Sequence, residues 1–184
     1  QEQQMIRDLA RKIAREKLLP VRAELDEREE FPWEIVRVSA EAGLMGVSMP
    51  EEYEGFGGGV LEYCLVAEEL SRACLGIATS VVASGLGAMP ILLYGSPEQK
   101  KEYLPGIAKG KKLAAFGLTE ADAGSDAGSI RTTATRTKEG YLLNGTKQWI
   151  TNGGEAEVYT VVAMTDRSKG PRGASAFIVS KGDK

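Results

Sequence analysis

The chain has 184 residues, of which 42% are hydrophobic and 27% are charged, and its formal net charge is −3. This balance is ordinary for a globular protein and gives no reason to expect binding to nucleic acid or to an anionic membrane surface. The absence of histidine excludes His-based catalytic triads and His-ligated metals, and we expect no metal centre.

The two cysteines, Cys64 and Cys74, fall within one apolar helical pattern. On a helix this spacing separates them by roughly 15 Å, which is too far for a disulfide. We therefore expect two reduced thiols in the core. The charged N-terminus lacks the apolar core of a signal peptide, and no apolar run approaches the roughly 20 residues that cross a bilayer. The sequence favours a cytoplasmic protein that does not insert into a membrane.

The first part of the chain carries apolar residues at helical spacing, which predicts six helices and no strand before residue 111. The first pattern covers residues 1–29 and should break near Leu19, because proline at position 20 cannot continue it. The next helix should begin at Pro32, in the position that proline favours, and end at Gly43.

The third helical pattern has an apolar stripe, with Glu69 and Arg72 among its polar positions. Residues 76–94 are small and apolar on nearly all sides, which predicts a central helix packed by neighbours everywhere. Pro90 should end or bend this helix. A capping box at Ser96–Gln99 then begins the last helix of this part.

After Lys112 the spacing becomes strand-like, and we expect strands at Leu113–Leu118, Ile130–Thr137, Tyr141–Leu143, Thr146–Ile150, Val158–Met164 and Ala174–Val179. Asn144-Gly145 is a strong hairpin signal and should join the third of these strands to the fourth. Because no helix-length segment connects the strands, we expect antiparallel pairing. The predicted fold class is α+β, with an all-helical domain over residues 1–111 and an antiparallel β-barrel-like or sandwich domain over residues 112–184.

The stretch from Phe116 to Asp126 (FGLTEADAGSD) joins the two parts. An apolar strand there gives way to a tight loop that presents backbone N–H groups and the hydroxyls of Thr119 and Ser125. Such a loop suits an anionic or acceptor-rich ligand, because amides donate hydrogen bonds without a counter-charge. Neither G-x-G-x-x-G nor a Walker pattern is present, which excludes Rossmann and P-loop sites. Taken alone, the loop also fits an ordinary turn, and Trp149 also fits a core or sheet-face aromatic.

Taken together, three segments resemble motifs of the acyl-CoA dehydrogenase family. Phe116–Asp126 resembles its first flavin motif, Lys147–Asn152 (KQWITN) resembles its second, and Tyr94–Pro105 is similar to the segment that precedes them. One departure is Ala121-Asp122, where many members have Pro-Gly. The resemblance covers the whole chain. It implies an all-helical domain and a β domain with FAD at their junction, followed in the family by a C-terminal helical bundle that lies beyond this chain.

The resemblance also implies roles for individual residues. Trp149 would lie against the flavin ring, where a flat aromatic side chain excludes water, and Thr151 would donate towards the reactive N5 region. Ser125 would meet phosphate oxygens of FAD or of acyl-CoA. Leu86 and Met89 would line the acyl pocket, although core packing explains them equally well. The residues expected to contact FAD are Phe116, Leu118, Thr119, Gly124, Ser125, Trp149, Ile150 and Thr151.

The implied reaction is the α,β-dehydrogenation of an acyl-CoA thioester, in which a carboxylate removes the α proton while a hydride passes from the β carbon to the flavin. In the family this base is a Glu of the C-terminal domain. We therefore expect no catalytic residue in this chain, and we assign Glu120 a structural role in the loop. An electron-transferring flavoprotein as electron acceptor and a homotetramer are further expectations for the full-length enzyme.

Two alternatives remain open. The chain could be a non-catalytic flavin-binding or acyl-CoA-binding fragment, or a scaffold within a larger assembly. It could also belong to a flavin oxidase of the same fold, such as an acyl-CoA oxidase or a nitroalkane oxidase. A flavin absorbance spectrum separates a flavoprotein from a scaffold, and access of oxygen to the flavin separates an oxidase from a dehydrogenase.

Overall fold

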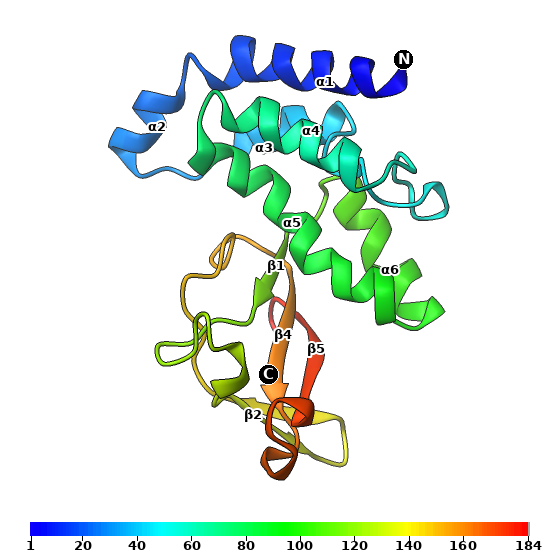
Figure 1. Cartoon of the computed structure of the whole chain (residues 1–184), viewed down its shortest axis with the longest axis vertical. Coiled ribbons are helices and arrows are strands. Elements are labelled where there is room, and N and C mark those ends of the chain that lie inside the picture. Colours follow the sequence, from blue (N-terminus) through cyan, green and yellow to red (C-terminus); the bar gives the residue numbers. More distant parts are fainter. Residues whose placement is uncertain (184) are drawn as a thin grey trace.

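A computed structural model describes residues 1–183 of the chain. Helices fill one half of the molecule and strands fill the other (Figure 1). The α-helices are α1 Glu2–Ile13, α2 Arg22–Arg28, α3 Trp33–Glu41, α4 Val60–Ser71, α5 Leu75–Tyr94 and α6 Pro97–Ala108. All six precede residue 111, and no strand does, as the sequence predicts.

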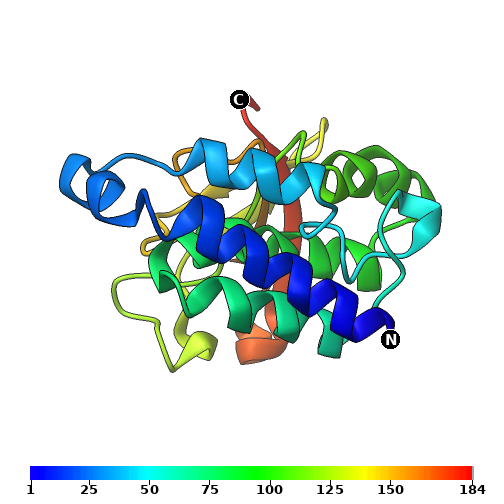
Figure 2. The same cartoon turned by 90° about the horizontal axis from the view of Figure 1, so that it is seen from above.

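The breaks between the first helices follow the predicted signals. α1 continues through a π-helical turn at Ala14–Leu18, and the chain leaves helical structure at Pro20, which has no N–H to donate. α3 begins directly after Pro32. The backbone then turns at Gly43, whose φ of 77° lies in the left-handed region that favours glycine. The view from above shows α1 lying across the helical layer (Figure 2).

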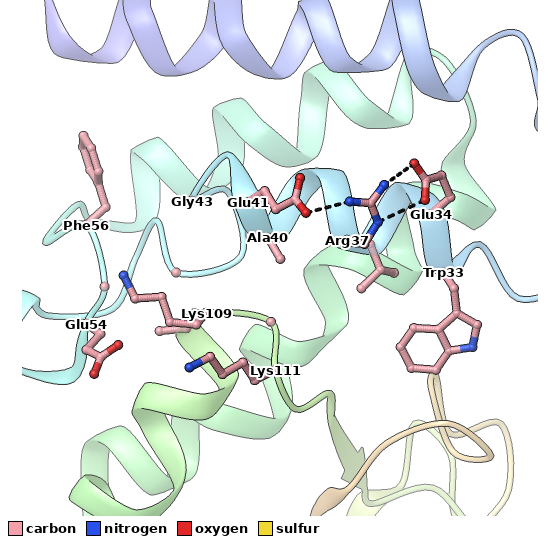
Figure 3. A pocket seen from close by; sticks show the side chains of 15 residues that line it. Trp33, Glu34, Arg37, Ala40, Glu41, Gly43, Glu54, Phe56, Lys109 and Lys111 are labelled. Atoms are coloured by element: carbon pink, nitrogen blue, oxygen red, sulfur yellow. Dashed lines mark hydrogen bonds and ion pairs between the residues drawn. The ribbon is translucent and has the colours of Figure 1, made fainter.

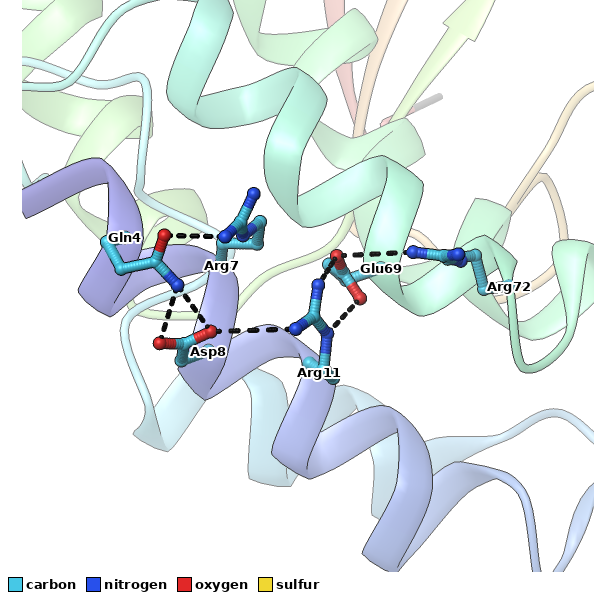
Figure 4. A network of polar contacts seen from close by, with 6 residues as sticks. All are labelled: Gln4, Arg7, Asp8, Arg11, Glu69 and Arg72. Atoms are coloured by element: carbon cyan, nitrogen blue, oxygen red, sulfur yellow. Dashed lines mark hydrogen bonds and ion pairs between the residues drawn. The ribbon is translucent and has the colours of Figure 1, made fainter.

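An ion pair between a half-buried arginine and a buried glutamate fastens α1 to α4 (Figure 4). Nε and Nη2 of Arg11 donate to the two carboxylate oxygens of Glu69 at 2.9 and 2.7 Å. Glu69, one of the polar positions of the third helical pattern, is only 3% exposed. The hydrogen bonds from Arg11 lower the pKa of this carboxyl, which keeps it ionised inside the helical layer.

α5 is long and apolar enough to cross a membrane by length and composition, with a mean hydropathy of 1.7. In this structure it packs against α4, α6, β1 and β4, which accounts for its apolar sequence as an internal helix. The prediction that neighbours pack it on all sides is wrong, because Leu86 and Leu93 are exposed. Of the two effects predicted for Pro90, an end to the helix is contradicted, because the helix continues to Tyr94.

The sheet contains the strands β1 Ala114–Gly117, β2 Thr133–Arg136, β3 Tyr141–Asn144, β4 Val158–Met164 and β5 Ala174–Ser180. β4 is the central strand. It pairs with β5 in the antiparallel direction and with β1 in the parallel direction. The prediction of a purely antiparallel sheet is therefore wrong, and the sheet is mixed. Parallel strands need a crossover connection. Here residues 118–157 supply it with loops and the β2–β3 hairpin rather than with a helix.

The hairpin does not turn at Asn144-Gly145 as predicted. β2 pairs with β3 instead, and the turn between them is closed by a bond from the Thr137 N–H to the Gly140 carbonyl at 2.9 Å. Residues 146–150 form no strand. The glycine at position 145 serves close packing, because a Cβ there would overlap Thr132.

The cysteines also differ from the prediction. α4 ends at Ser71 and α5 begins at Leu75, so Cys64 and Cys74 do not share one helix. Cys64 is exposed and Cys74 is half-buried. Both are free thiols, as expected, but they do not lie in the core.

Candidate functional site

The loop that follows β1 is closed by a pair of backbone hydrogen bonds. Glu120 and Ala123 each donate an N–H to the carbonyl of the other, both at 3.1 Å. Ala123 is buried, whereas Ala121 and Asp122 lie exposed at the tip of the turn. Nη1 of Arg131 lies 3.0 Å from the Asp122 carboxylate across this tip. These bonds give the loop a fixed shape, although Ala121-Asp122 stands where the motif that it resembles often has Pro-Gly.

Glu120 is the structural centre of the loop. Its carboxylate is buried and accepts hydrogen bonds from the backbone N–H groups of Arg131 and Thr132 at 2.5 and 3.0 Å, and from Nζ of Lys147 at 2.7 Å. Burial alone would raise the pKa of this carboxyl, but these three donors outweigh it and lower the pKa to about 2. Glu120 is thus ionised and fully engaged, which confirms its predicted structural role and makes it a poor proton acceptor.

Lys147 joins the two sequence motifs. Besides its bond to Glu120, its Nζ donates to the Leu118 carbonyl at 2.9 Å. The next residue, Gln148, donates its N–H to the Thr119 carbonyl at 3.0 Å. The segment that begins with KQW therefore lies against the end of β1, so the structure brings the two predicted motifs together. Two carbonyls at the end of β1 are used in this contact.

Trp149 begins a tight turn rather than lying in a strand. Its φ is 58°, in the left-handed region, and its side chain is 85% exposed. This exposure contradicts the alternative of a core aromatic, and the lack of a strand at residues 146–150 contradicts the alternative of a sheet-face aromatic. The following residue, Ile150, is half-buried and packs against the core of the helical domain. Thr151 is exposed. A large flat side chain thus stands out from a turn whose neighbours are anchored.

The remaining loop residues form a polar rim. Gly124 and Ser125 are exposed, and the chain then enters a short 3-10 turn at Ala127–Ser129. The Ser129 N–H donates to the Asp126 carbonyl at 3.1 Å, and the Ser129 hydroxyl donates to the Asp126 carboxylate. The predicted contact residues at the end of β1, namely Phe116, Leu118 and Thr119, are half-buried.

The predicted substrate residues lie on α5. Leu86 is 59% exposed and Met89 is 37% exposed, so core packing within residues 1–183 does not account for either side chain. Leu93 is exposed as well, and these three positions follow one another at the spacing of a single helix face. α5 thus presents an uncovered apolar stripe.

Two protein-family models match the chain, one over the helical part and one over the strand part. Residues 1–111 match the N-terminal domain of acyl-CoA dehydrogenases, and residues 115–184 match the middle domain. The chain belongs to the acyl-CoA dehydrogenase family.

Similar proteins bear the same family name. A short-chain-specific acyl-CoA dehydrogenase of Clostridium acetobutylicum is 45% identical over 185 residues, a match that covers 100% of this chain and 48% of that protein. The solved structure of a Bacillus anthracis acyl-CoA dehydrogenase complexed with FAD is 43% identical, with a TM-score of 0.88, covering 98% of this chain and 31% of that one. A chain in a structure of the electron transferring flavoprotein of Acidaminococcus fermentans is 45% identical, with a TM-score of 0.95, covering 99% of this chain and 48% of that one.

The chain spans about half the length of the curated relatives that it matches. Whatever chemistry the other half contributes in those proteins is therefore not represented among the residues described here. The acyl-CoA dehydrogenase middle-domain match begins at residue 115, within β1, which places the Glu120 loop and the Trp149 turn together in that domain.

The residues of the site fit a flavin ring. An indole that is 85% exposed offers a flat apolar face that gains free energy when a planar ligand covers it. Thr119, Ser125 and Thr151 add hydroxyls, which can donate to the acceptor atoms of such a ring and its phosphates. The carboxylate of Glu120, the residue after Thr119, accepts hydrogen bonds from three donors. Because these donors offset its negative charge, it does not repel a reduced, negatively charged ring at close range.

A separate groove of about 640 Å³ lies on the helical domain (Figure 3). Its lining comes from α3, from the segment around Phe56 and from the end of α6, and it includes no residue of either flavin motif. Arg37 bridges Glu34 and Glu41 along one wall at 2.6 and 2.7 Å. These three side chains pair with one another, and Glu54, Lys109 and Lys111 also line the groove.

Sequence reasoning missed the two residues that fix this site. In the sequence, Lys147 is the first residue of the second motif and has no assigned role. In the structure, its ammonium group bonds to Leu118 and Glu120 and so links the two motifs. Asn152 is the last residue of the same motif and also has no assigned role, but its side chain is buried and bonds to Ser80 of the helical domain. The sequence signal that could have pointed to these two residues is the presence of an ammonium and an amide side chain within three residues of Trp149.

Proposed function

We propose that the full-length protein containing this chain is an FAD-dependent acyl-CoA dehydrogenase. The observation that carries the proposal is the Glu120–Lys147 bond, because it places the Trp149 turn beside the Thr119 loop. Neither motif is specific alone, but the two together form one site with an exposed aromatic face and hydroxyl donors. The likeness to an acyl-CoA dehydrogenase that is complexed with FAD supports the same cofactor here.

In this proposal the side chains of the site hold and orient the cofactor. FAD, when bound, supplies the acceptor for a hydride. Trp149 covers one part of the ring and excludes water from it. The hydroxyls of Thr119 and Thr151 donate hydrogen bonds to the ring edges, which favours the additional negative charge of the reduced form. Ser125, exposed on the rim, contacts phosphate oxygens of FAD or of acyl-CoA.

The substrate is proposed to lie along α5. The apolar stripe of Leu86 and Met89 is uncovered in this structure and offers an acyl chain the contact area that it needs. The substrate loses a proton from its α carbon and a hydride from its β carbon, and becomes the α,β-unsaturated thioester. The proton acceptor is proposed to lie in the half of the protein beyond residue 184, because Glu120 is fully engaged and Asp122 faces Arg131 at the exposed loop tip.

Two further proposals concern partners and setting. Electrons are passed to an electron-transferring flavoprotein, a partner suggested by the likeness to a chain in such a structure. The full-length enzyme is proposed to assemble as a cytoplasmic homo-oligomer.

The proposal is tested on the purified full-length protein. We expect a flavin absorbance spectrum, anaerobic loss of the oxidised flavin absorbance on addition of acyl-CoA, and recovery of that absorbance with an electron-transferring flavoprotein. A colourless protein that binds no FAD would contradict the proposal and favour the scaffold. Hydrogen peroxide formed rapidly from oxygen with acyl-CoA would favour an acyl-CoA oxidase, and turnover of nitroalkanes would favour a nitroalkane oxidase.

A further inference from the structure

The Trp149 turn is tied to the helical domain by the packing of Ile150 and by one side-chain hydrogen bond. Nδ2 of Asn152 donates to the backbone carbonyl of Ser80 on α5 at 3.0 Å, a contact between residues 72 positions apart in the sequence. Asn152 is only 7% exposed, although Trp149 and Thr151 in the same turn are exposed. The buried end of the turn is therefore the point at which its position relative to α5 is set.

The backbone of Asn152 also suits this position. Its φ is 63°, in the left-handed region that asparagine adopts more readily than most other side chains. Its carbonyl accepts the N–H groups of Glu155 and Ala156 at 3.0 and 2.8 Å, and the Gly153 N–H donates to the Ile150 carbonyl at 2.9 Å. Glycine would satisfy the φ angle equally well, but it has no side chain to reach Ser80. The conformation and the contact together require an amide side chain.

This contact belongs to a row of three along α5. Ser84 accepts the N–H of Ala114 in β1 at 3.2 Å, and the Gly87 carbonyl accepts the hydroxyl of Thr160 in β4 at 2.7 Å. Ser80, Ser84 and Gly87 follow at the spacing of one helix face. β1 and β4 are also held by the sheet ladder between them. The turn has no ladder, and its bond to α5 adds to the packing of Ile150 and to the bond from the Tyr159 hydroxyl to the Gly153 carbonyl.

The two polar atoms of the Asn152 amide differ in their contacts. Among the described residues, Oδ1 of Asn152 is buried and accepts no hydrogen bond. An unpaired buried acceptor is unfavourable, and such groups are rare in folded proteins. The bond from Nδ2 to the Ser80 carbonyl is therefore the polar contact that this side chain makes among the described residues.

We propose that Asn152 is a positioning residue, which holds Trp149 and Thr151 at a fixed place relative to α5 and hence sets the flavin against the acyl chain. The inference rests on the proposed function. α5 carries Leu86 and Met89 on its uncovered stripe and Ser80 at the anchor, so one helix fixes both reacting partners. Trp149, at 85% exposure, has little packing of its own to fix its direction.

The test compares Asn152→Gly with Thr160→Val in the full-length protein. Asn152→Gly keeps the left-handed backbone and removes only the anchor. Thr160→Val removes another buried bond from α5, at Gly87, and leaves the turn untouched. The measurements are FAD affinity, quenching of Trp149 fluorescence by FAD in a Trp33→Phe background, and hydrogen exchange at the Gly153 and Ala156 amides. Trp33 and Trp149 are the two tryptophans of these 184 residues, and any tryptophan in the rest of the full-length protein is also replaced by phenylalanine.

We expect Asn152→Gly to weaken FAD binding by about three- to ten-fold, to reduce the quenching and to speed exchange at both amides. Thr160→Val should lower thermal stability while leaving FAD affinity and quenching at wild-type values. Wild-type affinity and quenching in Asn152→Gly, with FAD bound normally by the unmodified protein, would overturn the positioning role alone. If the unmodified protein binds no FAD, the proposed function fails, and the role of Asn152 fails with it.

A second variant guards against loss of folding. Asn152→Asp keeps the size and backbone preference of asparagine but replaces the donor with a carboxylate that faces the Ser80 carbonyl. We expect the same direction of change in FAD affinity and quenching as for Asn152→Gly. Opposite directions in the two variants would contradict the inference.

Discussion

The ammonium group of Lys147 lies 2.7 Å from Oε1 of Glu120 and 2.9 Å from the Leu118 carbonyl, with both charged side chains almost fully buried. This pair connects two segments that are 27 residues apart in the sequence. One segment ends in the hydroxyl-bearing loop and the other in the Trp149 turn. The bond between these two residues is therefore what turns two separate motifs into one site.

Glu120→Gln should destabilise the protein strongly. The substitution keeps the size of the side chain but leaves the Lys147 ammonium buried without a counter-charge. Breaking a buried pair from one side costs roughly 3–5 kcal/mol. The measurement is the free energy of unfolding from denaturant titration. The double variant Glu120→Gln/Lys147→Met should recover part of the loss, whereas Asp122→Asn, which breaks an exposed pair with Arg131, should cost no more than about 1 kcal/mol. A cost as small as that of Asp122→Asn would contradict the assignment.

Glu120 should also contribute to the pH dependence of stability. Burial acts to raise the pKa of its carboxyl, but the donors Lys147, Arg131 and Thr132 lower it to about 2 in the folded state. Because the folded pKa lies below the unfolded one, the contribution is fully present above the unfolded pKa of about 4.5 and is lost as the pH falls towards 2. The difference in unfolding free energy between wild type and Glu120→Gln should therefore shrink over this window. A difference that stays constant between pH 6 and pH 3 would show that this carboxyl titrates normally.

Trp149→Ala should weaken FAD retention while the fold survives. The side chain is 85% exposed, so its removal leaves no cavity in the core. Loss of a large aromatic contact from a binding site typically costs 2 kcal/mol or more, which corresponds to roughly 30-fold in the dissociation constant. FAD affinity and the melting temperature of the apoprotein are the two measurements. Trp33 lies outside the site, and therefore Trp33→Ala should leave FAD affinity unchanged. Equal losses in the two variants would mean that Trp149 does not contact the ring.

Thr119→Val should shift the reduction potential of the bound flavin downwards. The change keeps the shape of the side chain and removes one hydrogen-bond donor, which is worth roughly 0.5–1.5 kcal/mol. For a two-electron couple this corresponds to about 10–30 mV. Thr119→Ser retains the hydroxyl and should keep the wild-type potential. An unchanged potential in the valine variant would place the hydroxyl away from the flavin.

The helices were readable from the sequence because their signals are local. Prolines at positions 20 and 32, Gly43 and the capping box at Ser96–Gln99 mark breaks and starts within a few residues of the helix that they affect. The capping box forms as predicted, with the Gln99 N–H bonded to the Ser96 hydroxyl and the Gln99 side chain bonded back to the Ser96 N–H. Signals of this kind depend on backbone geometry more than on distant contacts.

The sheet and the turn were not readable, because their determinants lie far apart in the chain. Whether β1 pairs with β4 in parallel depends on the path of the whole crossover. Asn144-Gly145 carries a local hairpin signal, but packing of Gly145 against Thr132 overrides it. The motifs identified the site residues through resemblance, whereas their attachment through Lys147 and Asn152 appears only in three dimensions.

We propose that this chain forms the flavin-binding half of an α,β-dehydrogenase whose catalytic base lies beyond residue 184. The most direct test follows the absorbance of the oxidised flavin after anaerobic mixing with acyl-CoA thioesters, for the full-length protein and for the 184-residue chain in parallel. We expect reduction by the full-length protein at enzymatic rates, of the order of 1–10³ s⁻¹, and essentially none by the isolated chain with added FAD. Reduction by the isolated chain at comparable rates would place the base within residues 1–184 and contradict the account.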